Sequence, residues 1–153
     1  MIQKIGPHKV QCQDIMLGVN NLLGSEKVDF VYSDPPWGQG NLRYWQTINH
    51  RHTGKEKRDI DYIAFFNQFF SILKTHLKDV AVIEYGERWR NDFIALANSY
   101  GFQHHGYCTS LYKAGSDLLP VDIHLISKSG LYKMTDKFIK GCYELRGQKL
   151  VHH

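Results

Sequence analysis

Four consecutive residues, Asp34-Pro35-Pro36-Trp37, combine the side chains in this sequence that are best suited to chemistry. The carboxylate of Asp34 accepts hydrogen bonds, and the indole of Trp37 offers a flat surface on which another ring can stack. Each proline fixes its φ at about −65° and also restricts the residue before it. The segment can therefore hold an acceptor and a carbonyl in position without the support of a sheet.

A fixed acceptor beside a flat ring suits a planar ligand that carries hydrogen-bond donors. The alternative without chemistry is that the four residues only end a strand, since Pro-Pro is common in loops.

The flanking residues place this segment between a strand and a loop. Residues 28–32 are a β-branched and aromatic run, which predicts a buried strand that stops at the prolines. Residues 38–58 are polar and basic without a sustained apolar period, which predicts a mobile surface loop. Asp59 is expected to cap the next helix. The apolar stripe of that helix is Ile63, Phe66, Phe70, Leu73 and Leu77.

Helices and strands alternate along the rest of the chain. A strand over residues 80–85 is followed by a helix from 89 to 100 that Gly101 closes. Strands over 107–112 and 121–126 are expected to pair antiparallel. Before the catalytic candidate, residues 9–12 predict a strand and 16–23 a short helix.

This order predicts one α/β domain over residues 1–153, with three layers and a Rossmann-like, mostly parallel sheet that has an antiparallel C-terminal edge. The hydrophobic content of 42% is enough for one core in a chain of this length. Ligands of such sheets bind beyond the carboxyl ends of the strands. The segment from Asp34 to Trp37 follows a strand at that place.

The stretch Val31-Tyr32-Ser33-Asp34-Pro35-Pro36-Trp37 resembles the catalytic strand and loop of the S-adenosylmethionine-dependent amino-methyltransferases, which carry Asp/Asn/Ser-Pro-Pro-Tyr/Phe/Trp. That family includes DNA adenine and cytosine amine methyltransferases and, through Asp-Pro-Pro-Trp, messenger-RNA adenine methyltransferases. The exocyclic amine on which this family acts is a poor nucleophile, because its lone pair is delocalised into the base ring, so the site must accept its hydrogens and let the nitrogen become pyramidal. The resemblance implies that the Asp34 carboxylate and the Pro35 carbonyl each accept one amine hydrogen. It further implies that Pro36 stiffens the loop, that Trp37 stacks on a flipped base, and that S-adenosylmethionine is the cofactor.

A second, weaker similarity concerns the cofactor. Residues 10–16, which include Asp14, are similar to a family segment, often Gly-Asp-Cys, whose aspartate lies near the cofactor; here glutamine replaces the glycine. The resemblance thus assigns Asp14, together with Asp34, to the cofactor site. Capping of the following helix is an equally good interpretation of Asp14.

The sequence lacks the glycine-rich loop, aromatic-x-Gly-x-Gly or Gly-Ser-Gly-Thr, with which this family binds its cofactor. Residues 113–116 are the nearest candidate, and they do not open a helix. In circularly permuted members the cofactor half follows the catalytic half, and residues 147–153 resemble the approach to it. The sheet can therefore be incomplete.

Three interpretations follow from this missing loop, and they belong to different functional classes. In the first, the chain is a compact enzyme with an atypical cofactor loop. In the second, it is one half of an enzyme that is completed in a homo-oligomer or by a second subunit. In the third, it is a non-catalytic module that binds nucleic acid or a partner. We favour the enzyme, because a retained aspartate and aromatic ring are unnecessary for binding alone.

Basic and aromatic side chains follow the motif, beside the expected mouth of the site. They predict contacts with phosphates and bases, and the net charge of +4 agrees with an anionic partner. With the family resemblance, we expect this partner to be DNA before RNA, and the acceptor to be adenine before cytosine. A solvated charged loop is the alternative. The residues assigned to nucleic-acid binding are Arg43, Tyr44, Trp45, Arg51, Lys55, Lys57 and Arg58.

No metal site is expected. The three cysteines, Cys12, Cys108 and Cys142, are widely and irregularly spaced, which predicts neither a disulfide framework nor a zinc site. The pairs His104-His105 and His152-His153 lack ligand partners at metal spacing and are expected at the surface. Without a signal peptide or a long apolar run, the chain is expected to be cytoplasmic and to have no membrane partner.

Overall fold

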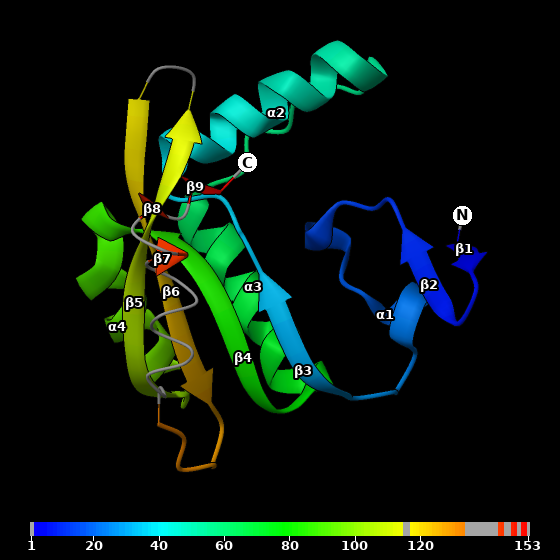
Figure 1. The fold of residues 1–153 in the computed structure, drawn as a ribbon. Helices are drawn as coiled ribbons and strands as arrows, with labels where there is room; N and C mark the ends of the chain where they lie inside the picture. Colours follow the sequence, from blue (N-terminus) through cyan, green and yellow to red (C-terminus); the bar gives the residue numbers. More distant parts are fainter. Residues whose placement is uncertain (1, 115–116, 134–143, 146–147, 150, 153) are drawn as a thin grey trace.

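The computed structural model describes residues 2–114, 117–133, 144–145, 148–149 and 151–152 (Figure 1). Within these residues it is a mixed α/β structure, as predicted. The elements in chain order are β1 Ile2–Ile5, β2 His8–Gln11, the 3-10 helix η1 Ile15–Leu17, α1 Asn20–Leu23, β3 Val28–Ser33, α2 Gln39–Thr53, α3 Tyr62–His76, β4 Leu77–Gly86, the 3-10 helix η2 Glu87–Trp89, α4 Arg90–Ser99, β5 Gln103–Ala114, β6 Asp117–Ser127, β7 Glu144–Leu145, β8 Gln148–Lys149 and β9 Val151–His152.

The main sheet has five strands in the order β3-β4-β6-β5-β9. β3 pairs parallel with β4, and β5 pairs parallel with β9, whereas β6 runs antiparallel to both of its neighbours. The expected antiparallel pair from residues 107–112 and 121–126 is confirmed. Among the described strands, β3, β4, β5 and β9 therefore run in the same direction, which confirms a mostly parallel sheet. The expected place of the antiparallel strand is wrong, because the hairpin folds back and inserts β6 between β4 and β5 and not at the edge of the sheet.

Helices α3 and α4 lie on the same side of this sheet (Figure 1). Phe70 of α3 and Phe93 of α4 pack with their ring centroids 6.0 Å apart, and both belong to one buried cluster with Ala81 and Ile83 of β4. In the described part of the chain no helix covers the opposite face of the sheet. The three-layer expectation is therefore not met there, and two layers are seen.

The core confirms the predicted helix before residue 77, with three corrections, the first of which is that Leu77 is not part of the helix but the first residue of β4. Phe66, Phe70 and Leu73 are buried along α3 as expected. The helix is capped by Asp61, whose Oδ2 accepts the backbone N–H of Ala64 at 3.0 Å, and Asp59 is not the cap. Because α3 begins only at residue 62, Ile63 lies in its first, solvent-facing turn and is 58% exposed.

β3 carries the motif at its end and is less buried than its sequence predicts. Phe30 and Tyr32 are each 53% exposed. The reason is topological, since β3 is the last strand of the described sheet and the face that carries these rings has no helix against it. An apolar run therefore predicted the strand correctly and its burial wrongly.

The segment before β3 lies outside the main sheet. The expected strand over residues 9–12 exists as β2, but it pairs only with β1. The expected helix over 16–23 is split into η1 and α1, because Gly18 between them has a φ of 75° and ends the first turn. None of the described helices is long and apolar enough to cross a membrane.

The largest correction concerns residues 38–58, which were expected to form a loop. Residues Gln39–Thr53 form α2, a helix of 15 residues that extends away from the sheet (Figure 1). Only Leu42 is buried along it. A helix with one buried residue has no apolar stripe, so the periodicity that reveals other helices was absent here.

Candidate active site

The motif forms the corner between β3 and α2, with the carboxylate and the indole facing each other. Asp34 is exposed, and its Oδ1 accepts a hydrogen bond from Trp37 Nε1 at 2.9 Å. The backbone N–H of Trp37 donates to Oδ1 of Asn41 at 3.0 Å. Trp37 is therefore held at its indole by the carboxylate and at its backbone by the first turn of α2.

The two prolines are fixed from below by tyrosines. Pro35 is buried, and the carbonyl of Pro36 accepts a hydrogen bond from the Tyr62 hydroxyl at 3.2 Å. That hydroxyl also bonds to the hydroxyl of Tyr85 on β4, and burial raises the pKa of Tyr62. These hydrogen bonds connect the corner to the core formed by α3 and β4. Such support agrees with the expected role of the prolines in stiffening the corner.

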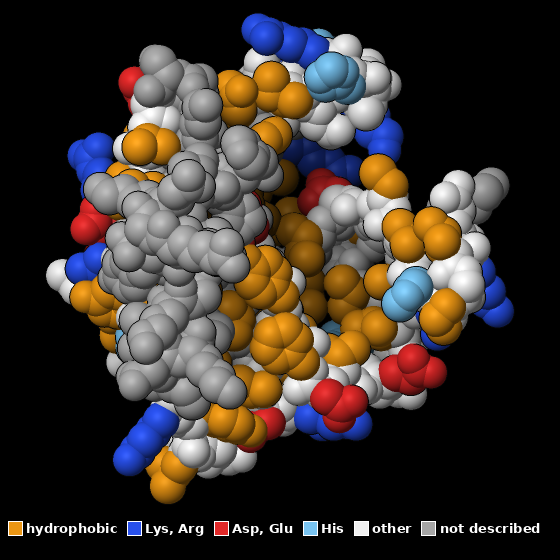
Figure 2. Space-filling view, in the orientation of Figure 1, with side chains coloured by type: hydrophobic (Ala, Val, Ile, Leu, Met, Phe, Trp, Pro, Cys, Tyr) orange, Lys and Arg blue, Asp and Glu red, His pale blue; other side chains and the backbone are white. Residues whose placement is uncertain are grey.

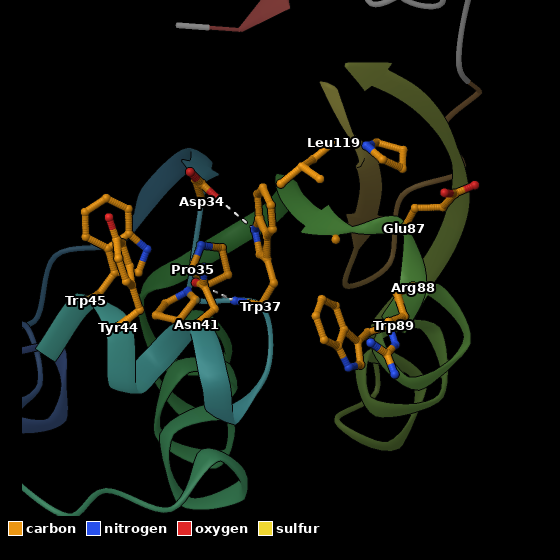
Figure 3. A pocket seen from close by; sticks show the side chains of 13 residues that line it. Asp34, Pro35, Trp37, Asn41, Tyr44, Trp45, Glu87, Arg88, Trp89 and Leu119 are labelled. Atoms are coloured by element: carbon orange, nitrogen blue, oxygen red, sulfur yellow. Dashed lines mark hydrogen bonds between the residues drawn. The ribbon is translucent and has the colours of Figure 1, made fainter. Parts of the chain in front are cut away.

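A cavity of about 680 Å³ opens beside the motif (Figure 3). One side, which we call wall one, consists of Asp34–Trp37 and the α2 residues Asn41, Tyr44 and Trp45. The opposite side, wall two, consists of residues 86–89 and the hairpin residues Leu119 and Pro120. The volume is sufficient for a drug-sized planar ligand.

Wall two was not identified from the sequence, in which Trp89 was assigned only to the apolar face of a helix. Trp89 packs so closely that a Cβ placed on Gly38 would lie 3.1 Å from its indole, and one on Gly86 would lie 2.8 Å from it. The predicted order of the strands nevertheless gave an indication of this position. β3 and β4 are parallel neighbours, so the residues after each strand meet at the same end of the sheet.

An ion pair anchors wall two to the sheet. Arg90, directly after Trp89, donates from Nε to Oδ2 of Asp122 at 2.5 Å and from Nη2 to Oδ1 at 3.0 Å. Asp122 is fully buried on β6 and also accepts the Thr109 hydroxyl at 2.7 Å. These bonds raise the pKa of Arg90, whose guanidinium also lies 4.0 Å from the ring centroid of Tyr107.

The predicted nucleic-acid residues lie on α2 and the segment after it. Tyr44 and Trp45 line the pocket and meet edge to face, with ring centroids 5.4 Å apart. Arg43 and Arg51 are exposed on the helix, and Lys55 and Lys57 are exposed beyond its end. Arg58 is paired with Asp14 at 3.0 Å, which ties the end of this segment to the N-terminal part.

Asp14 has the capping position that the sequence allowed. Its Oδ1 accepts the backbone N–H of Met16 at 2.9 Å, at the start of η1, while Oδ2 pairs with Arg58. Asp14 is not one of the residues that line the pocket. The cap is therefore confirmed, and the cofactor role of Asp14 stays a prediction.

The histidine pair at 104–105 is not a surface pair, which corrects the expectation. His104 Nε2 lies 2.9 Å from Nδ1 of the fully buried His124, and His105 Nε2 lies 2.7 Å from the Ser127 hydroxyl. The strand β5 turns both side chains toward β6. Among the described residues no group of three or more His, Cys, Asp or Glu side chains is placed to hold a metal ion.

The structure describes some, but not all, of the remaining cysteines and histidines that were considered as metal ligands. Cys12 is exposed, and Cys108 is buried in a small cluster with Val82 and Ile123. Cys142 and His153 lie outside the described residues. His152 belongs to β9.

The solved structures that are similar to this chain include two methyltransferases. No protein-family model and no curated protein matches the sequence. The first structure is described as an RNA methyltransferase, PH1948 from Pyrococcus horikoshii; it is 18% identical with a TM-score of 0.44 over 72% of this chain. The second is M1.HpyAVI in complex with SAM, which is 12% identical with a TM-score of 0.40 over 76% of this chain. This chain covers 45% and 53% of those two proteins, about half of their length.

Proposed function

We propose that this chain belongs to a Rossmann-like S-adenosylmethionine-dependent methyltransferase that methylates an exocyclic base amine in nucleic acid. The pocket between the two walls receives the base. The observation that carries the proposal is an exposed carboxylate, Asp34, fixed against an indole at the mouth of a cavity with aromatic walls. Adenine in DNA is the first acceptor to test, followed by cytosine and by RNA.

The carboxylate of Asp34 has the chemistry that an amine acceptor needs. An ionised carboxylate accepts several hydrogen bonds through its two oxygens, so a bond from Trp37 does not exhaust its capacity. An amine hydrogen held by such an acceptor fixes the direction of the nitrogen lone pair. The Pro35 carbonyl is the second acceptor in this proposal, and it belongs to the same stiff corner.

The aromatic side chains suit a flat base. Trp37 and Trp45 of wall one and Trp89 of wall two all line the cavity. Figure 3 shows the Trp37 indole beside Asp34, with Trp89 projecting from the other wall. Stacking of a base on an aromatic side chain contributes about 1–3 kcal/mol and tolerates any base. We therefore expect the rings to supply binding and Asp34 to supply orientation.

The residues of the pocket also fit a positively charged methyl donor. Carboxylates from Asp34 and Glu87 and the faces of several tryptophans attract a cation. When bound, S-adenosylmethionine would supply the methyl group: its sulfur–methyl bond would break as the nitrogen–methyl bond forms, S-adenosylhomocysteine would leave, and the amine nitrogen would lose one proton to solvent. Asp34 is the residue of this chain that holds an amine hydrogen in that step.

Substitution of Asp34 tests the proposal. We expect Asp34→Ala to lower methyl transfer to an oligonucleotide by about 10²- to 10³-fold, the range observed when one preorganised polar group is removed from an active site. The measurement is incorporation of tritiated methyl groups from S-adenosylmethionine into DNA and RNA. Asp59→Ala is the matched control, since Asp59 is an exposed aspartate that does not line the pocket. Unchanged labelling by the Asp34→Ala variant would refute the assigned role.

A binding module without catalysis is the second candidate, and the missing glycine-rich loop favours it. Isothermal titration with S-adenosylmethionine separates the two. Heat of binding supports the enzyme, whereas no heat at high protein concentration, with nucleic acid still retained in a gel shift, supports the module. The same titration repeated with a candidate second subunit tests whether another polypeptide supplies the cofactor half.

A further inference from the structure

The rim of the pocket on the α2 side is aromatic and exposed. Tyr44 is 57% exposed and Trp45 is 51% exposed, although both also line the cavity. Rings that are half in the cavity and half in solvent have surface available for a second base beside the one in the pocket. Successive bases stacked on successive aromatic side chains are typical of proteins that bind single strands.

Cationic side chains continue from these rings along the same helix. Arg51 and His52 follow Tyr44 and Trp45 by seven residues, which is two helical turns and about 10.5 Å along the axis, so each lies on the same side of α2 as its ring. Arg43 precedes the rings, and all three cationic or imidazole side chains are exposed. Figure 2 shows Lys, Arg and His side chains gathered over this part of the molecule, in the orientation of Figure 1.

The opposite rim has a different character. The β5–β6 hairpin presents Leu118, 50% exposed, and Leu119, 44% exposed, next to Pro120. The charged groups described on this side are the carboxylates of Glu87 and Asp117 and the guanidinium of Arg88. This rim suits the apolar edge of a base better than a phosphate.

We infer that the pocket acts on an unpaired, single-stranded segment of nucleic acid, whose backbone follows α2 while a neighbouring base stacks on Trp45 and Tyr44. The inference deepens the proposed function and depends on it for the base in the pocket. A duplex carries phosphates on both strands, and their contacts with cations supply most of the affinity of a DNA-binding surface. Among the described residues the opposite rim offers Arg88 against the several cations of α2, beside two carboxylates and exposed leucines, so a second strand would find fewer phosphate contacts there.

Binding to matched single-stranded and duplex oligonucleotides tests the inference. We expect fluorescence anisotropy with the full chain, at one fixed salt concentration, to show at least tenfold tighter binding of the single strand. Trp45→Ala should weaken single-strand binding by about 5- to 150-fold, the equivalent of one lost stacking contact. Trp45→Phe should restore most of it. Phe30→Ala is the matched control, because Phe30 is 53% exposed on β3 and lies outside the pocket, and it should bind like the unmodified chain.

The outcomes separate this inference from the proposed function. Equal or tighter binding of the duplex, together with methylation of duplex DNA, overturns the inference and leaves the methyltransferase proposal standing. Single-strand binding that Trp45→Ala leaves unchanged, or that Trp45→Phe does not restore, overturns the assigned stacking. No binding and no methylation of any nucleic acid by the folded chain overturns both. Parallel oligonucleotides of DNA and of RNA show which backbone the α2 rim accepts.

Discussion

The two walls of the pocket are held in place by different kinds of interaction. In wall one, Trp37 is fixed by neutral and charge-assisted hydrogen bonds to Asp34 and Asn41, three and four residues away in the sequence. In wall two, Trp89 is anchored through Arg90 to Asp122, a fully buried carboxylate 32 residues further along the chain. The Trp37 side of wall one therefore depends on contacts that are close in the sequence, with the Tyr62 bond to the Pro36 carbonyl as an added support, whereas Trp89 depends on one long-range ion pair.

This difference predicts which wall adjusts to a ligand. Typical hydrogen bonds contribute about 1 kcal/mol each, so an exposed corner held by a few of them shifts at low cost. Separation of a buried ion pair costs about 3–5 kcal/mol. We expect wall one, which carries the chemistry, to close on a base, and wall two to be the fixed surface against which it closes.

The largest effect is expected from removal of the anchor. Arg90→Ala leaves the carboxylate of Asp122 buried without its guanidinium, so the free energy of unfolding should fall by about 3–5 kcal/mol. The lower part of this range is expected because the Arg90 side chain is 26% exposed. Urea denaturation followed by tryptophan fluorescence measures the change.

Two further variants test whether the ion pair between Arg90 and Asp122 is the anchor. Glu87→Gln removes the exposed partner that lies 3.4 Å from Arg90, and we expect a loss of less than about 1 kcal/mol. Arg90→Lys keeps the charge but loses the two-point contact, so its stability should lie between the two. Equal losses from Glu87→Gln and Arg90→Ala would show that Asp122 is not the anchor.

An intermediate effect is expected where the walls meet. A Cβ at Gly86 would lie 2.8 Å from the Trp89 indole and 3.3 Å from the Cβ of Trp37, so Gly86→Ala pushes on both walls. Overpacking of this kind costs about 1–3 kcal/mol. We expect a loss of stability in urea and a fall in methyl transfer. Gly40→Ala is the control, because a Cβ there meets nothing within 4 Å; a loss as large as that of Gly86→Ala would contradict the packing argument.

Much of the fold was accessible from the sequence because its elements bury a periodic face. α3, α4, β4 and the β5–β6 pair were predicted near their observed positions, since each carries an apolar stripe or run. α2 was missed because only Leu42 is buried along it. The position of β6 inside the sheet was not predictable, since it depends on pairing between segments that are about 40 residues apart, as in Val82 and Leu125.

The residues of the candidate site also differ in whether the sequence alone identifies them. Asp34 and Trp37 were found because their chemistry and their neighbours lie within one short segment. Trp89 was missed as a wall residue because its position depends on Gly38, Gly86 and the anchor at Asp122. The buried pairing of His104 with His124 was missed because only the strand register brings the two rings together.

The smallest effect expected concerns the histidines beneath wall two. Burial, first of all, and the neighbouring His104 lower the pKa of His124 to about 3; burial also lowers the pKa of His104. The Nε2 atom of His124 is buried without a hydrogen-bond partner among the described residues. Asp122, whose Oδ2 lies 3.9 Å away, favours the protonated ring, but the effect of burial is larger. The folded chain therefore keeps His124 neutral where an unfolded histidine, with a pKa of about 6.5, is protonated.

Because the unfolded state then binds more protons, the free energy of unfolding should fall as the pH drops below about 6.5. We expect a loss on the order of 1 kcal/mol from His124 between pH 7 and pH 5.5, a window above the usual range of the carboxylates. Urea denaturation at the two pH values measures it. His124→Gln should reduce this pH dependence, whereas His52→Gln, an exposed histidine of α2, should leave it unchanged. If both variants keep the full pH dependence of the free energy of unfolding, another group titrates. A neutral His124 then does not contribute to the stability of wall two.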